Sequence, residues 1–138
     1  MRFMILVKAT ADTEAGILPT TDDLMAEMAA YHEELRRAGM LIDGSGLKPT
    51  AKGWRITYDG RKRSVSDGPF AETKELVAGY TLIRAKSREE ALEWTKRFPN
   101  PSLDGGAAQI EVRELYELED FVAGEAVERF REMGMGGE

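Results

Sequence analysis

The sequence predicts a single α+β domain with a ferredoxin-like arrangement, in which two helices cover one face of an antiparallel sheet. Three observations predict this fold. Two segments, residues 2–9 and 76–84, carry apolar side chains on both alternating faces, as central strands do. Each of them precedes a segment with helical apolar spacing, and a strand-like hairpin sequence lies between the two halves. A chain of 138 residues has room for one core.

The first half of the chain is predicted to form a strand, a polar connector and a long helix. Thr20 or Thr21 followed by two aspartates predicts the start of the helix, and Gly39 is a suitable residue to end it. Between them, apolar residues recur at spacings of four and three and form one stripe. The stripe comprises Leu24, Met28, Tyr31, Leu35 and Ala38.

The middle of the chain changes to the pattern of short strands. Asp59-Gly60 is a strong signal for the two-residue turn of a hairpin. The basic cluster Arg61-Lys62-Arg63 follows this turn, so we expect its charges to be solvated at the hairpin tip. The strand-like patterns cover residues 40–47, 54–58 and 64–66.

The second half contains the clearest helix signal. Ser87 followed by Glu90 predicts a capping box, and the helix should stop before Pro99. Ile110 and Val112 then alternate with polar residues in a final strand. The predicted inner face of the helix consists of Ala91, Trp94, Thr95 and Phe98.

Residues 1–121 form the predicted domain, and residues 122–138 form a predicted C-terminal helical tail. Apolar residues at partly helical spacing between Phe121 and Met133 favour a terminal helix that docks on the domain. The glycine-rich end from Gly134 to Glu138 predicts a flexible terminus.

Two helices can cover one face of the predicted sheet, which leaves the second face bare. Strands 2–9 and 76–84 direct apolar side chains toward that face as well, and a bare apolar face on a soluble chain is usually an interface. A homodimer closed face to face is the economical solution. Within the second of these strands, Gly79 indicates a bulge or the close approach of another group.

Composition narrows the classes of function. The net charge of −6, without a basic stripe that carries aromatic residues, argues against nucleic acid as a partner. No apolar run approaches the roughly 20 residues needed to cross a bilayer, so we expect no membrane partner and a cytoplasmic location. The chain has no cysteine and one histidine, which excludes thiolate chemistry and histidine-rich metal sites. We expect no metal ion and no cofactor, and a carboxylate-only magnesium or calcium site would lack a supporting loop motif.

The run from Ser66 to Leu76 reads SDGPFAETKEL, and Gly79-Tyr80 comes shortly after it. This run resembles the DGPF signature of the YCII-related family, and the resemblance covers most of residues 1–121. It implies a ferredoxin-like fold that pairs as a dimeric α+β barrel, in agreement with the argument from the bare face. Some members of the family are linked to extracytoplasmic-function sigma factors. Further similar segments lie at residues 33–39, 46–49, 90–94 and 110–113.

The resemblance also implies a candidate site, because related branches carry a histidine and an aspartate near a pocket beside the sheet. The aspartate of the signature is Asp67, and the single histidine is His32. In the functional interpretation, Asp67 is a base or an orienting group, and His32 is its acid–base partner. In the alternative interpretation, Asp67 hydrogen-bonds the backbone of its own turn, and His32 is a half-buried residue at the edge of the apolar stripe.

Four further residues are candidates for binding a small molecule near the DGPF loop. Gly68 and Pro69 fix a sharp turn, and Phe70 would form an apolar wall beside Asp67. Arg113 lies on the polar face of the last strand, where its planar fork suits a ligand carboxylate or phosphate. An ion pair of Arg113 with Glu111 or with the partner subunit is the other interpretation.

These residues leave two functions open. The first is a homodimeric lyase or isomerase that transfers a proton without a cofactor, because no nucleophile, metal cluster or phosphate loop is apparent. The second is a non-catalytic ligand-binding or regulatory dimer that works with a sigma factor. No motif identifies the small-molecule ligand in either case.

Overall fold

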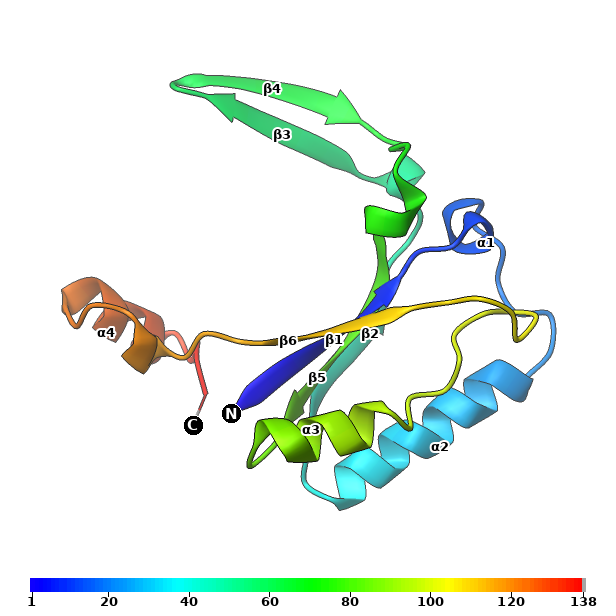
Figure 1. Ribbon diagram of the computed structural model, residues 1–138. Coiled ribbons are helices and arrows are strands. Elements are labelled where there is room, and N and C mark those ends of the chain that lie inside the picture. Colours follow the sequence, from blue (N-terminus) through cyan, green and yellow to red (C-terminus); the bar gives the residue numbers. More distant parts are fainter. Residues whose placement is uncertain (138) are drawn as a thin grey trace.

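The computed structural model describes residues 1–137 and confirms the predicted α+β class (Figure 1). Its main sheet is antiparallel and has four strands in the order β2-β5-β1-β6, so the two strands predicted as central lie in the middle. In Figure 1, α2 and α3 both lie on one side of this sheet. The four strands are β1 (Arg2–Lys8), β2 (Leu41–Gly46), β5 (Val77–Arg84) and β6 (Ile110–Glu114).

Helices α2 and α3 form where the sequence predicts, but α2 begins after Asp22 rather than after Thr20 or Thr21, and α3 ends at Thr95, before the predicted Phe98. Helix α2 (Asp23–Arg37) is followed by Gly39 with φ +74°, a conformation that glycine adopts without strain. Helix α3 (Arg88–Thr95) begins after Ser87, whose hydroxyl accepts a hydrogen bond from the backbone N–H of Glu90. The Glu90 carboxylate accepts from the N–H of Lys86 rather than of Ser87, so half of the predicted capping box forms.

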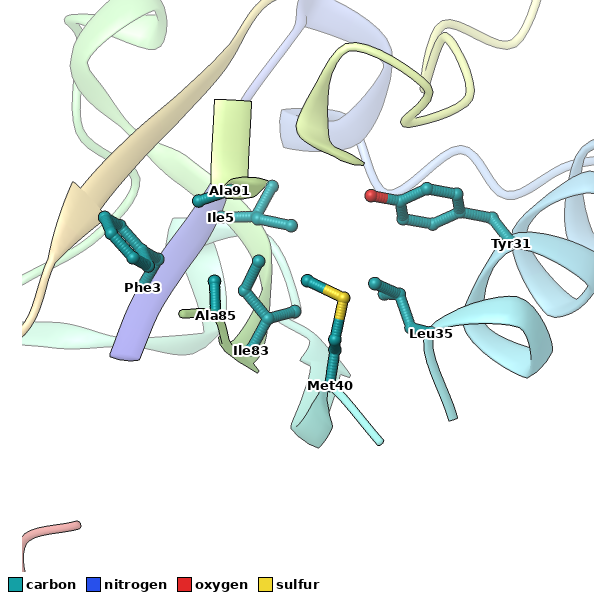
Figure 2. Packing of buried hydrophobic residues seen from close by; sticks show 8 residues of the cluster. All are labelled: Phe3, Ile5, Tyr31, Leu35, Met40, Ile83, Ala85 and Ala91. Carbon is teal, nitrogen blue, oxygen red and sulfur yellow. The ribbon is translucent and has the colours of Figure 1, made fainter. Parts of the chain in front are cut away.

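The core lies between the sheet and these helices (Figure 2). Alternate residues of β1 and β5 point toward the helices, which is why Ile5 and Ile83 are fully buried. Leu35 of α2 is fully buried against them. The hydroxyl of Tyr31 donates to the backbone oxygen of Trp94 at 2.8 Å and so joins α2 to α3. Burial raises the pKa of Tyr31 to about 12 because it disfavours the charged phenolate.

The opposite face of the sheet has an apolar centre, as predicted. Its central side chains are those of Met4, Leu6, Tyr80 and Leu82, which pair across β1 and β5 and are half-buried. Charged and polar residues flank them on the outer strands. On β2, Asp43 accepts a hydrogen bond from the Tyr80 hydroxyl at 2.9 Å, and this bond raises the pKa of Tyr80.

The predicted hairpin forms a separate two-stranded sheet of β3 (Trp54–Asp59) and β4 (Lys62–Asp67). Figure 1 shows it projecting away from the main sheet. Asp59 pairs with Lys62, so the turn is Gly60-Arg61, one residue further along than predicted. Gly60, with φ +63°, takes the first of these two positions, where a positive φ favours glycine.

The tail contains the predicted helix, α4 (Glu125–Glu132), but no residue of α4 is buried. The expectation that it docks on the core is therefore wrong: among the described residues of this segment, Val127 is half-buried, and Phe130 and Met133 are exposed. Figure 1 shows α4 set apart from α2 and α3. Part of the terminus predicted to be flexible, residue 138, lies outside the described residues. The short elements are α1 (Ala11–Glu14), η1 (Thr50–Lys52), η2 (Thr73–Glu75) and η3 (Leu118–Asp120).

Within residues 1–137, none of the helices has the length and apolar character needed to span a membrane.

Candidate functional site

A cavity of about 450 Å³ lies between α2 and the strands β2 and β5. Its volume falls in the range of roughly 300–1,000 Å³ that is usual for small-molecule sites. Apolar side chains from α2, from β1 and from the segment after α3 line it, together with two polar side chains. The apolar side chains are those of Val7, Met25, Met28, Ala29 and Phe98, the polar ones are those of His32 and Thr81, and strand residues 44–46 and 78–80 complete the lining.

His32 is held in this wall by hydrogen bonds at both ring nitrogens. Its Nδ1 lies 2.7 Å from the backbone oxygen of Met28, one helical turn earlier. A carbonyl oxygen can only accept, so in the neutral imidazole we assign the proton to Nδ1. Nε2, at 2.8 Å from Oγ1 of Thr81, then accepts the hydroxyl proton of Thr81. The arrangement leaves the basic nitrogen of the ring in contact with a hydroxyl group.

Aromatic rings restrict the orientation of the imidazole further. The centroid of His32 lies 5.7 Å from that of Tyr31 and 6.2 Å from that of Phe98, both in edge-on geometry. Tyr31 and Phe98 contact each other in the same way at 5.3 Å. These contacts, together with the two hydrogen bonds, place the ring in one position.

Thr81 is the site residue that the sequence analysis missed. It lies on β5 between Gly79 and Ile83, on the strand face directed at the helices, and it is 3% exposed. A hydroxyl group at a buried position of an apolar strand requires a hydrogen-bond partner. That requirement is the signal by which Thr81 and His32 could have been paired from the sequence.

Backbone atoms of β2 and β5 form the floor of the cavity. A Cβ atom on Gly79 would lie 3.0 Å from the backbone oxygen of Ser45, so the two strands approach closely there. The register between β1 and β5 also shifts beside Gly79, between Val7 and Lys8. The close approach and the bulge predicted at Gly79 are both present.

The DGPF loop lies elsewhere, at the base of the hairpin. Asp67 ends β4, pairs with Trp54 across the hairpin and is exposed. A Cβ atom on Gly68 would lie 1.8 Å from the backbone oxygen of Thr50, so only glycine fits there. The N–H of Phe70 donates to the Thr50 hydroxyl at 3.0 Å, and that hydroxyl donates to Glu14 at 2.6 Å. The loop is therefore held by Thr50 and Glu14.

The structure of the described chain does not bring the predicted site residues together. Of the described residues, those that line the cavity beside His32 do not include Asp67, Gly68, Pro69, Phe70 or Arg113. The hairpin projects from the sheet and carries Asp67 and the loop after it away from the cavity (Figure 1), and Arg113 pairs with Met4 on the opposite face of the sheet.

Phe70 and Arg113 each contact a charged side chain: Phe70 a guanidinium group and Arg113 a carboxylate. The guanidinium of Arg55 lies 3.8 Å from the centre of the Phe70 ring, so this ring is covered by a cation. Arg113 is exposed, with Nη1 at 3.9 Å from Glu111, which matches the ion-pair interpretation of Arg113.

Comparison with known proteins identifies the family. A sequence model of the YCII-related domain matches residues 1–120. The chain belongs to this family. An uncharacterized protein of Rhizobium meliloti (strain 1021) is 31% identical over 105 residues, which cover 76% of this YCII-related chain and 85% of that protein.

Among solved structures, the 5-chloro-2-hydroxyhydroquinone dehydrochlorinase of Burkholderia phenoliruptrix AC1100, in complex with 2,5-dihydroxybenzoquinone, is similar with a TM-score of 0.46. The sequence identity is 16%, and the match covers 85% of this chain and 95% of that chain.

Proposed function

We propose that this YCII-related protein is a homodimeric enzyme of the lyase or isomerase kind, which transfers a proton without a cofactor. Its ligand is a small, largely apolar organic molecule with a carbonyl or hydroxyl group, bound in the cavity beside His32. The observation that carries the proposal is the position of His32 in the cavity wall. One ring nitrogen is fixed by Met28, and the other accepts from the Thr81 hydroxyl.

This arrangement suits the transfer of a proton from a ligand. The Thr81 hydroxyl takes a proton from a ligand carbon or oxygen while its own proton passes to Nε2 of His32. The ring then carries a positive charge, and the backbone oxygen of Met28 stabilises the proton on Nδ1. Return of the proton to a different ligand atom completes an isomerisation, and its transfer to a leaving group completes an elimination.

Asp67, Gly68, Pro69, Phe70 and Arg113 take no step in this proton transfer, because within one chain they lie outside the cavity. In a dimer closed on the bare sheet face, the loop of the second copy also lies away from His32, whose cavity is on the helix side of the sheet, so the proposed reaction rests on His32 and Thr81. The apolar centre and polar rim of the bare sheet face support a face-to-face homodimer. The dimer itself is tested by light scattering at micromolar concentration, where a stable monomer would contradict it.

A specific observation also favours the second candidate, a non-catalytic regulatory dimer that works with a sigma factor. Such a protein needs exposed apolar residues outside the dimer contact. Ile17 and Leu18, in the connector before α2, are 49% and 78% exposed and lie outside the bare face of the sheet. In this case the bond between His32 and Thr81 ties α2 to β5, and the cavity binds an effector.

The single histidine makes the proposal directly testable, because every imidazole signal in an NMR spectrum belongs to His32. We would titrate the protein with small ketones from acetone to cyclohexanone, whose α-protons exchange with solvent deuterium when a base removes them. We expect saturable shifts of the His32 signals and faster α-proton exchange than in buffer. His32→Gln should abolish the acceleration, and Thr81→Val should reduce it by about tenfold or more.

Asp67→Asn is the matched comparison, because the amide keeps the shape of the side chain and removes its charge. Slower exchange in this variant would give Asp67 a part in the reaction, whereas unchanged exchange and unchanged stability would leave it without one. Saturable binding with equal exchange in wild type and His32→Gln would favour the non-catalytic candidate. Neither binding nor exchange with any ketone would contradict the proposed enzyme.

A further inference from the structure

One face of the β3–β4 hairpin is apolar and uncovered. Trp54, Ile56 and Tyr58 alternate along β3, and the register places Val65 of β4 beside Ile56 on the same face. These four side chains are between 46% and 67% exposed. An isolated two-stranded hairpin is marginally stable in water, so a hairpin with this face needs a surface to pack against.

The C-terminal segment, residues 114–137, also exposes apolar side chains. The rings of Tyr116 and Phe121 contact each other at 5.3 Å between centroids, yet they are 76% and 52% exposed. Val122 is 92% exposed, and Phe130 and Met133 of the α4 region are exposed as well. Among the described residues, the one ion pair that joins this segment to β1 is that of Arg2 with Glu117, at 2.6 Å.

The two uncovered regions carry opposite charges. The hairpin, residues 54–67, contains four basic and two acidic residues. The C-terminal segment contains seven acidic residues and two arginines. A protein with a net charge of −6 would repel a second acidic surface, whereas the hairpin offers a basic one. The charges therefore match the hairpin to the C-terminal segment.

Within one protomer, these two regions leave the sheet at opposite ends. Gly46, which ends β2 before the hairpin, pairs with Gly79, and Gly79 is level with Val7 and Ile110. Glu114, which ends β6 before the C-terminal segment, pairs with Phe3 at the other end of the sheet. Figure 1 shows the hairpin and α4 well separated.

A second copy of the chain removes this separation. When two sheets pack face to face about a two-fold axis perpendicular to their strands, the hairpin end of one sheet lies over the opposite end of the other. The symmetry then makes each contact twice.

We propose that the apolar face of the hairpin docks on the C-terminal segment of a second copy of this chain, and that the second hairpin docks on the first chain in return. The inference rests on the homodimer proposed above and specifies its orientation and its outer contacts. It accounts for two uncovered apolar regions with one arrangement.

The absence of cysteine from the chain permits a clean test by cross-linking. Two single-cysteine variants are used, Lys62→Cys at the hairpin tip and Glu132→Cys at the end of α4. The two chains, one enlarged by a tag, are co-expressed and treated with a short bismaleimide. We expect the product that joins one variant to the other to exceed either like-with-like product.

Each other outcome has a defined meaning. Predominant cross-linking of Lys62→Cys with itself would place hairpin on hairpin and overturn the proposed orientation. A dimer in light scattering without any cross-link would overturn the docking and leave the homodimer intact. A monomer would overturn both, while the α-proton exchange measured through His32 still decides the enzymatic proposal independently.

Charge reversal provides a second measurement. Arg61→Glu/Lys62→Glu should weaken the dimer by about tenfold or more, and Glu125→Lys/Glu132→Lys in the other chain should restore the affinity. Arg36→Glu/Arg37→Glu, at the exposed end of α2, makes the same change in net charge away from the contact. Equal weakening by this control would show a non-specific charge effect and contradict the docking.

Discussion

The two tryptophans of this protein lie in regions that contrast with each other. Trp94 of α3 packs against the buried core, with the guanidinium of Arg97 at 3.8 Å from its ring centre. Trp54 begins the hairpin and is 65% exposed. Both regions have apolar side chains on one face, but helices cover the sheet face and no part of the described chain buries the hairpin face. Apolar patterning therefore marks a core in one region and an uncovered surface in the other.

Truncation of one apolar residue in each region should give the largest difference in stability between the core and the hairpin. Leu35→Ala removes a fully buried side chain and should lower the free energy of unfolding by about 2–5 kcal/mol. Val65→Ala, on the 67% exposed position of the hairpin, should cost less than about 0.5 kcal/mol in dilute protein. Urea melts at low concentration measure both values. Similar losses for the two variants would mean that the hairpin is buried in the protomer.

A backbone substitution should disturb the base of the hairpin next most strongly. Gly68→Ala places a Cβ atom 1.8 Å from the backbone oxygen of Thr50, so the backbone must move, at a cost of about 2 kcal/mol. Gly53→Ala is the matched control in the same region, since its Cβ atom would lie at an ordinary 3.7 Å from that oxygen. The fluorescence of Trp54 in a Trp94→Phe background would report on the hairpin base. Equal stability of the two alanine variants would contradict the tight fit.

The same contrast explains how much of the fold could be predicted. The strands β1 and β5 have a two-sided apolar pattern because a core lies on one face and a second apolar surface on the other. The hairpin turn is displaced by one residue because Asp59-Gly60 and Gly60-Arg61 both place glycine in the two-residue loop. The sequence pattern therefore predicts the strands well, but it predicts the exact position of the turn between them less well.

The site was harder to predict because it depends on the directions of elements. His32 was recognised as a candidate, but its partner Thr81 is 49 residues away and became visible only when β5 packed beside α2. The separation of Asp67 from His32 follows from the way the hairpin projects, and no residue spacing encodes that direction. The tail shows the same limit, since helical spacing predicts α4 but not the surface that covers it.

Within the helix-covered region, Tyr31 should make stability depend on pH. The pKa of Tyr31 is raised from 10.0 to about 12, so the folded state holds the phenolic proton more tightly than the unfolded state. The corresponding stability is fully present below pH 10 and is lost as the pH rises from 10 to 12. Tyr31→Phe removes the hydrogen bond to the Trp94 backbone, so its free energy of unfolding at neutral pH should be about 1 kcal/mol lower. Between pH 10 and 12 its free energy of unfolding should fall less than that of the wild type. Parallel declines in both proteins would refute this role of Tyr31.

The smallest effect is expected on the polar face of the outer strand, at Arg113. Its side chain is 72% exposed, and the ion pair with Glu111 spans 3.9 Å, so Arg113→Ala should change the free energy of unfolding by less than about 0.5 kcal/mol.

Arg113 pairs with Met4 on β1 and therefore shares the bare face of the sheet, whereas the His32 cavity opens on the side of α2. We therefore expect the His32 signals to respond to ketones equally in the wild type and in Arg113→Ala. The variant is informative about the dimer, because Arg113 lies on the face that a second copy would cover. A weaker dimer with unchanged ketone binding would assign Arg113 to the interface, and a loss of ketone binding in the isolated monomer would return it to the ligand site.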